Sequence, residues 1–209
     1  MKKIILTLAF LLPIAVSAQK TDIPKKYAAG TVPVVDGSVV FSKDYTVNNK
    51  TSEQIYDSLL AYAEALTKSE DALPQSRIFT NDKANNLLVV NMEEWMYFKK
   101  KAWVTDRTRF YYQLLYQVRD GGFTVTMRNI HYLYEEERDI NGGFQYDAET
   151  WITDDVALVK NGTKLSRLSG KFRTFTIDRK DELFSQSNVA AGGKRTKKVR
   201  RIIYEDEEE

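Results

Sequence analysis

The segment spanning residues 107–135 constrains the fold most, because its alternating pattern predicts one long β-hairpin that turns on Gly121 and Gly122. Two adjacent glycines favour a two-residue turn, since the central residues of such a turn take positive φ, which costs little only without a Cβ atom. This turn sets the register and places Val118 opposite Val125 on one face of the hairpin. That face is apolar, so we expect it to be buried.

Further from the turn, the apolar residues of the second strand change phase, and a one-residue β-bulge near Arg128 and Asn129 restores the match. The bulge places Tyr112 opposite Tyr132 and continues the apolar face along the whole hairpin. An antiparallel sheet with one apolar face needs a cover on that face alone. The hairpin therefore predicts the α+β class, with helices packed on one face of an antiparallel sheet. Five alternating aromatic residues are predicted to be core: Phe110, Tyr112, Tyr116, Tyr132 and Tyr134.

The opposite face of the hairpin is mixed and largely polar, and it offers hydrogen-bond donors on a rigid surface. We predict that it binds a ligand, which would be a protein strand of the envelope, a glycan or an anionic headgroup. A solvated sheet face without a ligand is the alternative. The candidate binding residues are Arg109, Tyr111, Gln113, Gln117, Arg119, Thr126 and Arg128.

The beginning of the chain has the pattern of a secretory signal peptide. Lys2 and Lys3 precede the apolar residues 4–16, and small residues at Val16-Ser17-Ala18 predict cleavage before Gln19. We therefore expect a protein exported to the periplasm or the extracellular space. No later segment approaches the roughly 20 apolar residues of a membrane helix, so the mature chain is predicted not to span a membrane. The predicted parts are a signal peptide (1–18), an extended leader (19–32), a single α+β domain (33–189) and a flexible charged tail (190–209).

Composition excludes several functions. The chain has no cysteine, which excludes disulfides, thiolate catalysis and thiolate metal sites. It has 31 basic and 29 acidic residues, and two of the basic ones lie in the predicted signal peptide, so the mature charge balances. A nucleic-acid partner is therefore not expected. The predicted tail carries a basic run in residues 194–201 followed by an acidic run in residues 205–209.

Around the hairpin, periodicity predicts further elements. Thr51 and Gln54 form a capping-box pattern ahead of an apolar stripe, which predicts a helix that ends near Ser69. A last helix is expected to begin near Asp178 and to reach Ser187. The other expected elements are strands within 35–45, 77–81 and 87–98 and a short helix within 148–158.

No catalytic constellation emerges from the sequence, which predicts neither catalytic residues, nor metal ligands, nor a cofactor. His131 is the only histidine, and the predicted register places it opposite Gln113 on the polar face. Glu93 and Glu94 are neighbours in a predicted strand and should point to opposite faces. Asp154, with the acid that follows it, is expected in the first turn of a helix. An envelope hydrolase or transferase using such acids, and a purely structural envelope component, remain the alternatives to a non-enzymatic binding domain.

The chain resembles an exported bacterial family of unknown function, the DUF4468 type, which has a TATA-binding-protein-like (TBP-like) fold. The likeness extends over residues 32–187 and rests on three stretches. They are Pro33-Val34-Val35-Asp36-Gly37 with Val39 and Phe41, Ile55-Tyr56-Asp57, and residues 109–134 with Tyr112, Leu114, Val118, Asp120-Gly121, Asn129-Ile130, Tyr132 and Tyr134. The resemblance implies a curved antiparallel sheet with helices on one face, in the order β-α-β-β-β-β-α. It implies no activity, because function must be argued from a site.

Overall fold

The structure is a computed structural model that describes residues 23–101 and 103–194 of the chain. Its centre is a six-stranded antiparallel sheet in the order β3-β7-β6-β5-β4, and β8 pairs with the part of β7 that β3 leaves free. These strands are β3 (Phe41–Thr46), β4 (Arg77–Asp82), β5 (Leu87–Lys101), β6 (Val104–Arg119), β7 (Gly122–Tyr134) and β8 (Phe144–Asp147).

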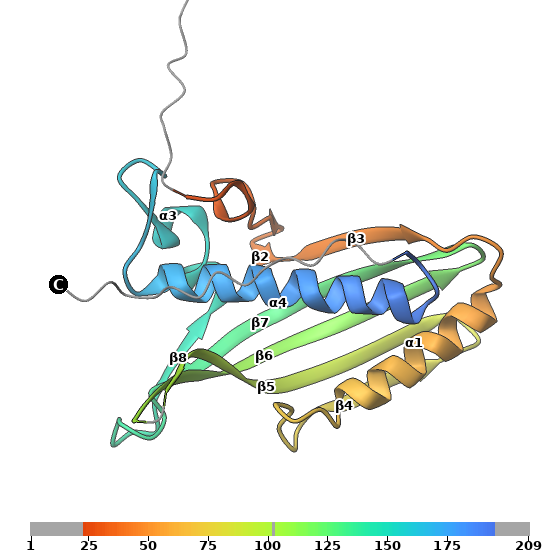
Figure 1. Ribbon diagram of the computed structural model, residues 1–209, viewed down its shortest axis with the longest axis horizontal. Helices are drawn as coiled ribbons and strands as arrows, with labels where there is room; N and C mark the ends of the chain where they lie inside the picture. Colours follow the sequence, from red (N-terminus) through yellow and green to blue (C-terminus); the bar gives the residue numbers. More distant parts are fainter. Residues whose placement is uncertain (1–22, 102, 195–209) are drawn as a thin grey trace, which may run out of the picture.

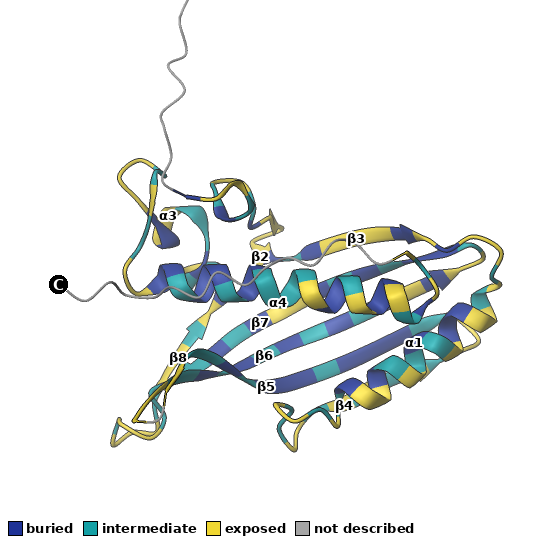
Figure 2. Cartoon of the chain, in the orientation of Figure 1, coloured by how far each residue is buried: buried dark blue, intermediate teal, exposed yellow. Residues whose placement is uncertain are grey.

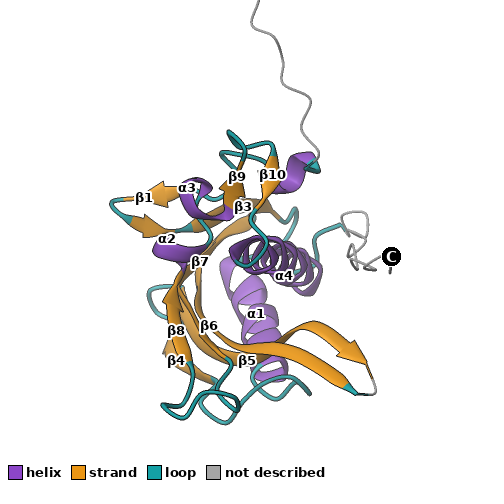
Figure 3. Cartoon of the chain, turned by 90° about the vertical axis from the view of Figure 1, so that its left-hand side faces the viewer, coloured by secondary structure: helices purple, strands orange, loops and turns teal. Residues whose placement is uncertain are grey.

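Two long helices, α1 (Ser52–Leu66) and α4 (Ser169–Ala190), cross the same face of the sheet (Figure 1). The sheet curves around both helices (Figure 3). The predicted α+β architecture is therefore confirmed. Smaller elements complete the fold: η1 (Lys25–Tyr27), β1 (Val34–Val35), β2 (Ser38–Val39), α2 (Ala148–Trp151), α3 (Asp154–Ala157), β9 (Leu158–Val159) and β10 (Lys164–Leu165).

The core lies between the sheet and the two long helices. Buried and partly exposed residues alternate along β6 and β7 (Figure 2), as expected for strands with one covered face, whereas β5 is buried on both faces at residues 88–90 and 92–94. The aromatic residues predicted to be core are buried, and three of them form hydrogen bonds with α4, among them Tyr134, which accepts from Lys171 at 2.8 Å. The hydroxyls of Tyr116 and Ser187 lie 2.9 Å apart, and those of Tyr132 and Thr176 lie 2.7 Å apart.

The central hairpin forms, but its turn lies one residue earlier than predicted. Val118 pairs with Phe123 rather than with Val125, and the two turn residues are Asp120 and Gly121. Between the turn and Leu115, each residue of β6 therefore faces a partner two positions earlier in β7 than predicted. Because side chains alternate with a period of two, the predicted buried and open faces are unchanged.

The two glycines serve different needs. Gly121 takes a φ of 72° in the turn, a conformation that favours glycine. Gly122 belongs to β7, and a Cβ atom there would lie 2.3 Å from the carbonyl oxygen of Tyr45 on β3. The close approach of β3 therefore explains why residue 122 is a glycine. The hairpin pattern alone did not predict this contact between β3 and β7.

The predicted bulge is present. The register shifts between Tyr111 and Gln113 of β6, and the extra residue lies in β7, where Asn129 takes a φ of 53°. Beyond the bulge, Phe110 pairs with Tyr132. The predicted pairing of Tyr132 with Tyr112 is therefore wrong by two positions, which is the same shift that the turn introduces.

The predicted helix at residue 52 and the predicted strand pair are confirmed. The hydroxyl of Thr51 accepts a hydrogen bond from the Gln54 backbone N–H, and the Gln54 side chain accepts one from the Thr51 backbone N–H. The predicted capping box therefore forms at the N-terminus of α1. The helix predicted within 148–158 forms as two separate turns, α2 and α3.

The prediction of a loosely held leader is wrong for residues 23–32. Tyr27 is buried, and its hydroxyl donates to the Asp178 carboxylate at 2.8 Å. Asp178, which was predicted to begin the last helix, lies in the interior of α4. The leader shows no sequence period because a single 3₁₀ turn is too short to produce one.

Helix α4 begins nine residues before the predicted start. Its first half buries polar side chains, among them Arg173, Thr174 and Thr176, so it shows no apolar stripe to predict from. At the other end, Ala191 of the predicted tail is buried. The predicted signal peptide and residues 195–209 lie outside the described residues.

Candidate functional site

The candidate site is the face of the sheet opposite α1 and α4, which we call the open face. Cross-strand pairs place all seven predicted binding residues on it, since Gln113 faces Arg128 and Leu115 faces Thr126 across β6 and β7. The prediction that these residues share one face is therefore confirmed.

A hollow of about 350 Å³ lies on this face beside the bulge. Its walls include Arg77, Asn91, Glu93, Tyr111, Gln113 and His131, which come from four neighbouring strands. Of the predicted residues, Tyr111 and Gln113 line the hollow directly. Arg109 and Arg128 border it through bonds to Glu93 and Gln113, respectively.

The three remaining predicted residues lie nearer the hairpin turn and do not reach the hollow. Gln117 donates to the carbonyl oxygen of Asn85 at 3.1 Å, and Arg119 forms an ion pair with Asp44 at 2.6 Å. The hydroxyl of Thr126 lies 3.1 Å from that of Ser42, on the edge strand β3. This part of the open face is a network of cross-strand bonds.

A stacked ring pair stands at the hollow. The rings of Tyr111 and His131 lie 4.4 Å apart and are inclined by only 7°. The predicted register had placed His131 opposite Gln113, and the actual register brings it opposite Tyr111. Burial, followed by the charge of Glu93, raises the pKa of the Tyr111 hydroxyl, so this group stays a neutral donor at physiological pH.

Amide groups beside the rings are held in fixed orientations. The Gln113 amide nitrogen donates to Asn91 at 2.9 Å, and its amide oxygen accepts from Arg128 at 2.8 Å. These two hydrogen bonds link the three strands β5, β6 and β7. Because both ends of the Gln113 amide are engaged, the surface beside the hollow is preorganised rather than loose.

The positive charge of Arg109 is compensated by two carboxylates. Its guanidinium donates two bonds to Glu136, at 2.6 and 2.7 Å, and a third to Glu93 at 2.9 Å. The hydrogen bonds to Glu136 raise the pKa of Arg109, with those to Glu93 adding to the effect and burial opposing it. One positive charge therefore faces two carboxylates, which leaves no positive excess for an anion.

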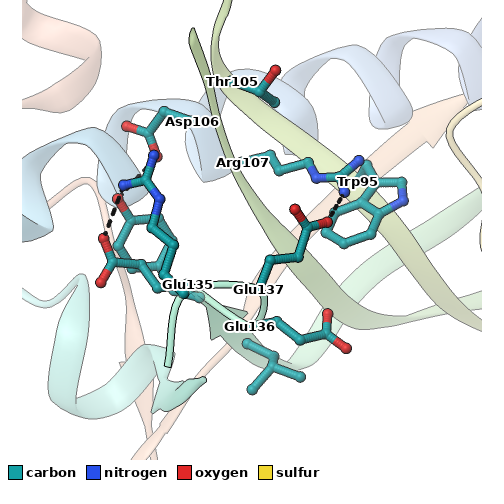
Figure 4. A pocket seen from close by; sticks show the side chains of 10 residues that line it. Trp95, Thr105, Asp106, Arg107, Glu135, Glu136 and Glu137 are labelled. Atoms are coloured by element: carbon teal, nitrogen blue, oxygen red, sulfur yellow. Dashed lines mark hydrogen bonds and ion pairs between the residues drawn. The ribbon is translucent and has the colours of Figure 1, made fainter. Parts of the chain in front are cut away.

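A second hollow of about 260 Å³ continues from the open face toward the β7–β8 loop (Figure 4). Arg107 lies 3.8 Å above the ring of Trp95 and forms an ion pair with Glu137. Figure 4 shows this pair and the ring on one wall, with Asp106 on the other side. Asp106 accepts bonds from Lys171 and from the Tyr134 hydroxyl. The charged groups of this hollow thus bind each other.

The acids that sequence reasoning named as catalytic candidates are engaged in separate ion pairs. Glu93 and Glu94 point to opposite faces of β5, as predicted, and Glu94 binds Arg179 through two bonds of 2.7 Å. Asp154 lies in the first turn of α3, as predicted, and accepts from Arg173 at 2.8 Å. In the part of the chain that the structure describes, no group of His, Cys, Asp or Glu side chains is arranged to hold a metal ion.

Sequence reasoning missed the contribution of β5 and of Arg77 on β4. Asn91 and Glu93 reach the hollow because β5 pairs with β6, placing them opposite Gln113 and Tyr111. The alternation of residues 87–98 was visible in the sequence, but the register between β5 and β6 was not. The sequence between these two strands carries no recognisable turn motif, so the turn could not be used to predict the register of β5 against β6.

Comparison with known proteins identifies the family. A crystal structure of a DUF4468 family protein from Bacteroides ovatus ATCC 8483 is 35% identical in sequence, with a TM-score of 0.73. The match covers 83% of this chain and 97% of that one. This chain belongs to the DUF4468 family. The family model, described as a domain of unknown function (DUF4468) with TBP-like fold, matches residues 41–133.

The DUF4468 match extends from β3 nearly to the end of β7 and so contains all seven predicted binding residues. A crystal structure of a TBP-like protein from Parabacteroides distasonis ATCC 8503 has a TM-score of 0.59 at 20% identity, covering 77% of this chain and 97% of that one. This second likeness shows the TBP-like fold alone. A search of curated proteins found no match. Within residues 23–101 and 103–194, no helix has the length and apolar content needed to cross a membrane.

Proposed function

We propose that this DUF4468 protein is an exported, non-enzymatic binding domain that takes its ligand on the open face. The observation that carries the proposal is the hollow of about 350 Å³ beside the stacked rings of Tyr111 and His131. Concave sites lined by ring surface and a few oriented polar groups are the usual form of ligand sites. Export is supported by the signal-peptide pattern of residues 1–18.

The chemistry of the hollow favours a glycan over an anionic headgroup or a protein strand. An anionic headgroup needs unpaired positive charge. Arg109 and Arg119 already bind carboxylates, whereas Arg77 and Arg128 donate to neutral groups of Gln75 and Gln113, which makes the headgroup the second candidate. A protein strand needs an unpaired strand edge, and the hollow lies on the face of paired strands. Ring surface beside oriented amides suits the apolar faces and hydroxyls of a sugar.

Hydrolysis has less support than binding. A general acid or a nucleophile must be free to reach the substrate, and each candidate acid is bound to an arginine: Glu93 to Arg109, Glu94 to Arg179 and Asp154 to Arg173. A retaining or inverting pair of carboxylates would also have to share one cleft. Glu93 and Glu94 lie on opposite faces of the sheet.

The proposal is tested by amide NMR titration of the protein, from Gln19 onward, with soluble oligosaccharides, including fragments of the bacterial cell wall. We expect shifts at residues of the hollow, and we expect Tyr111→Ala to weaken binding about tenfold through the loss of ring contact. Gln117→Ala, on the same face but outside the hollow, should bind as the wild type does. Glycerol phosphate and an extended peptide serve as the probes for the other two ligand classes.

Two results would contradict the binding proposal. One is a complete lack of shifts with every oligosaccharide, and the other is equal affinity of the Tyr111→Ala variant. Export is tested separately, by mass spectrometry of the protein recovered from cells of its natural host. A mature N-terminus at Gln19 is expected, and an intact Met1 would refute export through a cleaved signal.

A further inference from the structure

Strands β5 and β6 continue beyond the sheet as a two-stranded ribbon, which is independent of the open face. The pairing of β4 with β5 ends at Asn91, and that of β7 with β6 begins only at Thr108. Residues 97–101 and 104–107 therefore pair only with each other within the sheet. We call them the projecting ribbon, and Figure 3 shows it reaching away from the body of the sheet.

The base of the projecting ribbon is held firmly. Phe98 packs against Phe172 and Phe175 of α4, with ring centroids 4.7 and 5.1 Å apart. Lys171 of α4 donates to Asp106 at 2.7 Å. A two-stranded ribbon is marginally stable by itself, so these contacts explain why it keeps its form beyond the sheet.

The end of the projecting ribbon exposes a tryptophan among lysines. Trp103 is 97% exposed and Val104 is 47% exposed, and Lys100 and Lys101 beside them are also exposed. No residue from 97 to 105 is acidic. A single exposed apolar residue is common on protein surfaces, so the feature that distinguishes this end is the combination of an indole ring with lysines on a projecting ribbon.

We propose that the end of the projecting ribbon docks on an anionic lipid surface, with the Trp103 ring at the level of the headgroups. Tryptophan is favoured at the membrane interface because its ring is apolar and its N–H remains hydrated. Lys100 and Lys101 supply the positive charge that attracts an anionic leaflet. Only the ribbon's end enters the headgroup region, where water still satisfies the backbone groups of its free edges.

The size of the ribbon's end argues for a lipid rather than a protein. A stable protein interface uses about 20 to 30 residues on each side. Among the described residues, the exposed large apolar groups at this end come from two adjacent positions of a narrow ribbon, Trp103 and Val104. Such an end can insert among headgroups, because a bilayer closes around it, but it offers a folded partner little surface.

Nearby acids do not cancel the lysines. The β7–β8 loop carries Glu135, Glu136 and Glu137, and these bind Arg138, Arg109 and Arg107, respectively. Figure 3 shows the projecting ribbon directed away from β8. The charge that a membrane surface meets at the ribbon's end is therefore positive.

The test is co-sedimentation of the chain from Gln19 onward with vesicles of phosphatidylcholine alone or with phosphatidylglycerol, at low ionic strength. We expect binding only to the anionic vesicles. Trp103→Ala should lower partitioning about tenfold, and Lys100→Gln with Lys101→Gln about 25-fold, since each lysine contributes about fivefold. Tryptophan emission should shift to the blue on these vesicles, and Trp103→Phe should abolish the shift.

Matched controls separate the ribbon from other surfaces. Phe79→Ser removes an exposed ring on β4, and Lys68→Gln with Lys160→Gln removes two charges elsewhere. Both should partition as the wild type does. The proposal is overturned if the wild type does not bind anionic vesicles, or if the ribbon variants bind as well as the controls, which would assign binding to another segment such as the basic tail.

Discussion

Replacement of Arg173 by Met should strongly destabilise the fold, because Arg173 joins α4 to three separate segments. The side chain is fully buried. It donates to the carbonyl oxygens of Tyr27 at 2.9 Å, Ala28 at 2.7 Å and Ile152 at 2.8 Å, and to Asp154 at 2.8 Å. Burial lowers the pKa of Arg173, and the bond to Asp154 acts against that effect. Methionine keeps similar bulk but has no donor.

The cost follows from the acceptors left behind. Each buried carbonyl oxygen that loses its donor costs about 1 kcal/mol or more. Breaking a buried ion pair by removing one partner costs about 3–5 kcal/mol in other proteins. Because Asp154 is 37% exposed and can be hydrated, we place Arg173→Met at about 3–4 kcal/mol. That is a large part of the roughly 5–15 kcal/mol by which domains are stable.

Urea unfolding followed by circular dichroism measures this loss as a lower midpoint. Tryptic cleavage at Lys25 should also become faster, since residues 23–32 lose part of their attachment to α4. Arg167→Met is the control: Arg167 is exposed just before α4, so the same substitution there should cost less than about 1 kcal/mol. A stability of Arg173→Met within about 1 kcal/mol of the wild type, with unchanged cleavage, would refute the role assigned to Arg173.

Two further predictions concern the sheet and its tyrosines. Gly122→Ala should destabilise the protein by about 1–3 kcal/mol, because its Cβ would lie 2.3 Å from the backbone oxygen of Tyr45. Gly121→Ala meets no atom within 4 Å and should cost about 1 kcal/mol for its positive φ; in urea unfolding, a larger loss for Gly121→Ala would contradict this order. Burial raises the pKa of the core tyrosine hydroxyls, so the folded state favours the neutral phenol. This stabilisation is complete below the unfolded pKa of about 10 and is lost as the pH rises above it. The chain has 12 tyrosines, and the share of the phenolate absorbance that comes from these buried ones should therefore appear only with alkaline unfolding; complete ionisation of all the tyrosines near pH 10 with the fold intact would disprove it. These tyrosines are Tyr112, Tyr116 and Tyr132.

The candidate site was predicted in part. Alternation along β6 and β7 sufficed to place Tyr111 and Gln113 on the open face, because period-two alternation needs no partner. It did not reveal that His131 stacks on Tyr111 or that Asn91 binds Gln113. Those contacts depend on registers between strands, and the predicted hairpin register was two positions off.

The amino-acid sequence by itself determined the α+β class, the capping of α1, the bulge near residue 129 and the separation of buried from open sheet faces. These features follow from short-range rules, in which residues within a few positions of one another decide the local backbone and its apolar side. The tertiary structure alone decided that residues 23–32 pack on α4 and that α4 begins at Ser169. Arg173 illustrates the reason: a charged residue spoils the apolar stripe of a helix until acceptors from distant segments surround it, and only the complete fold supplies them.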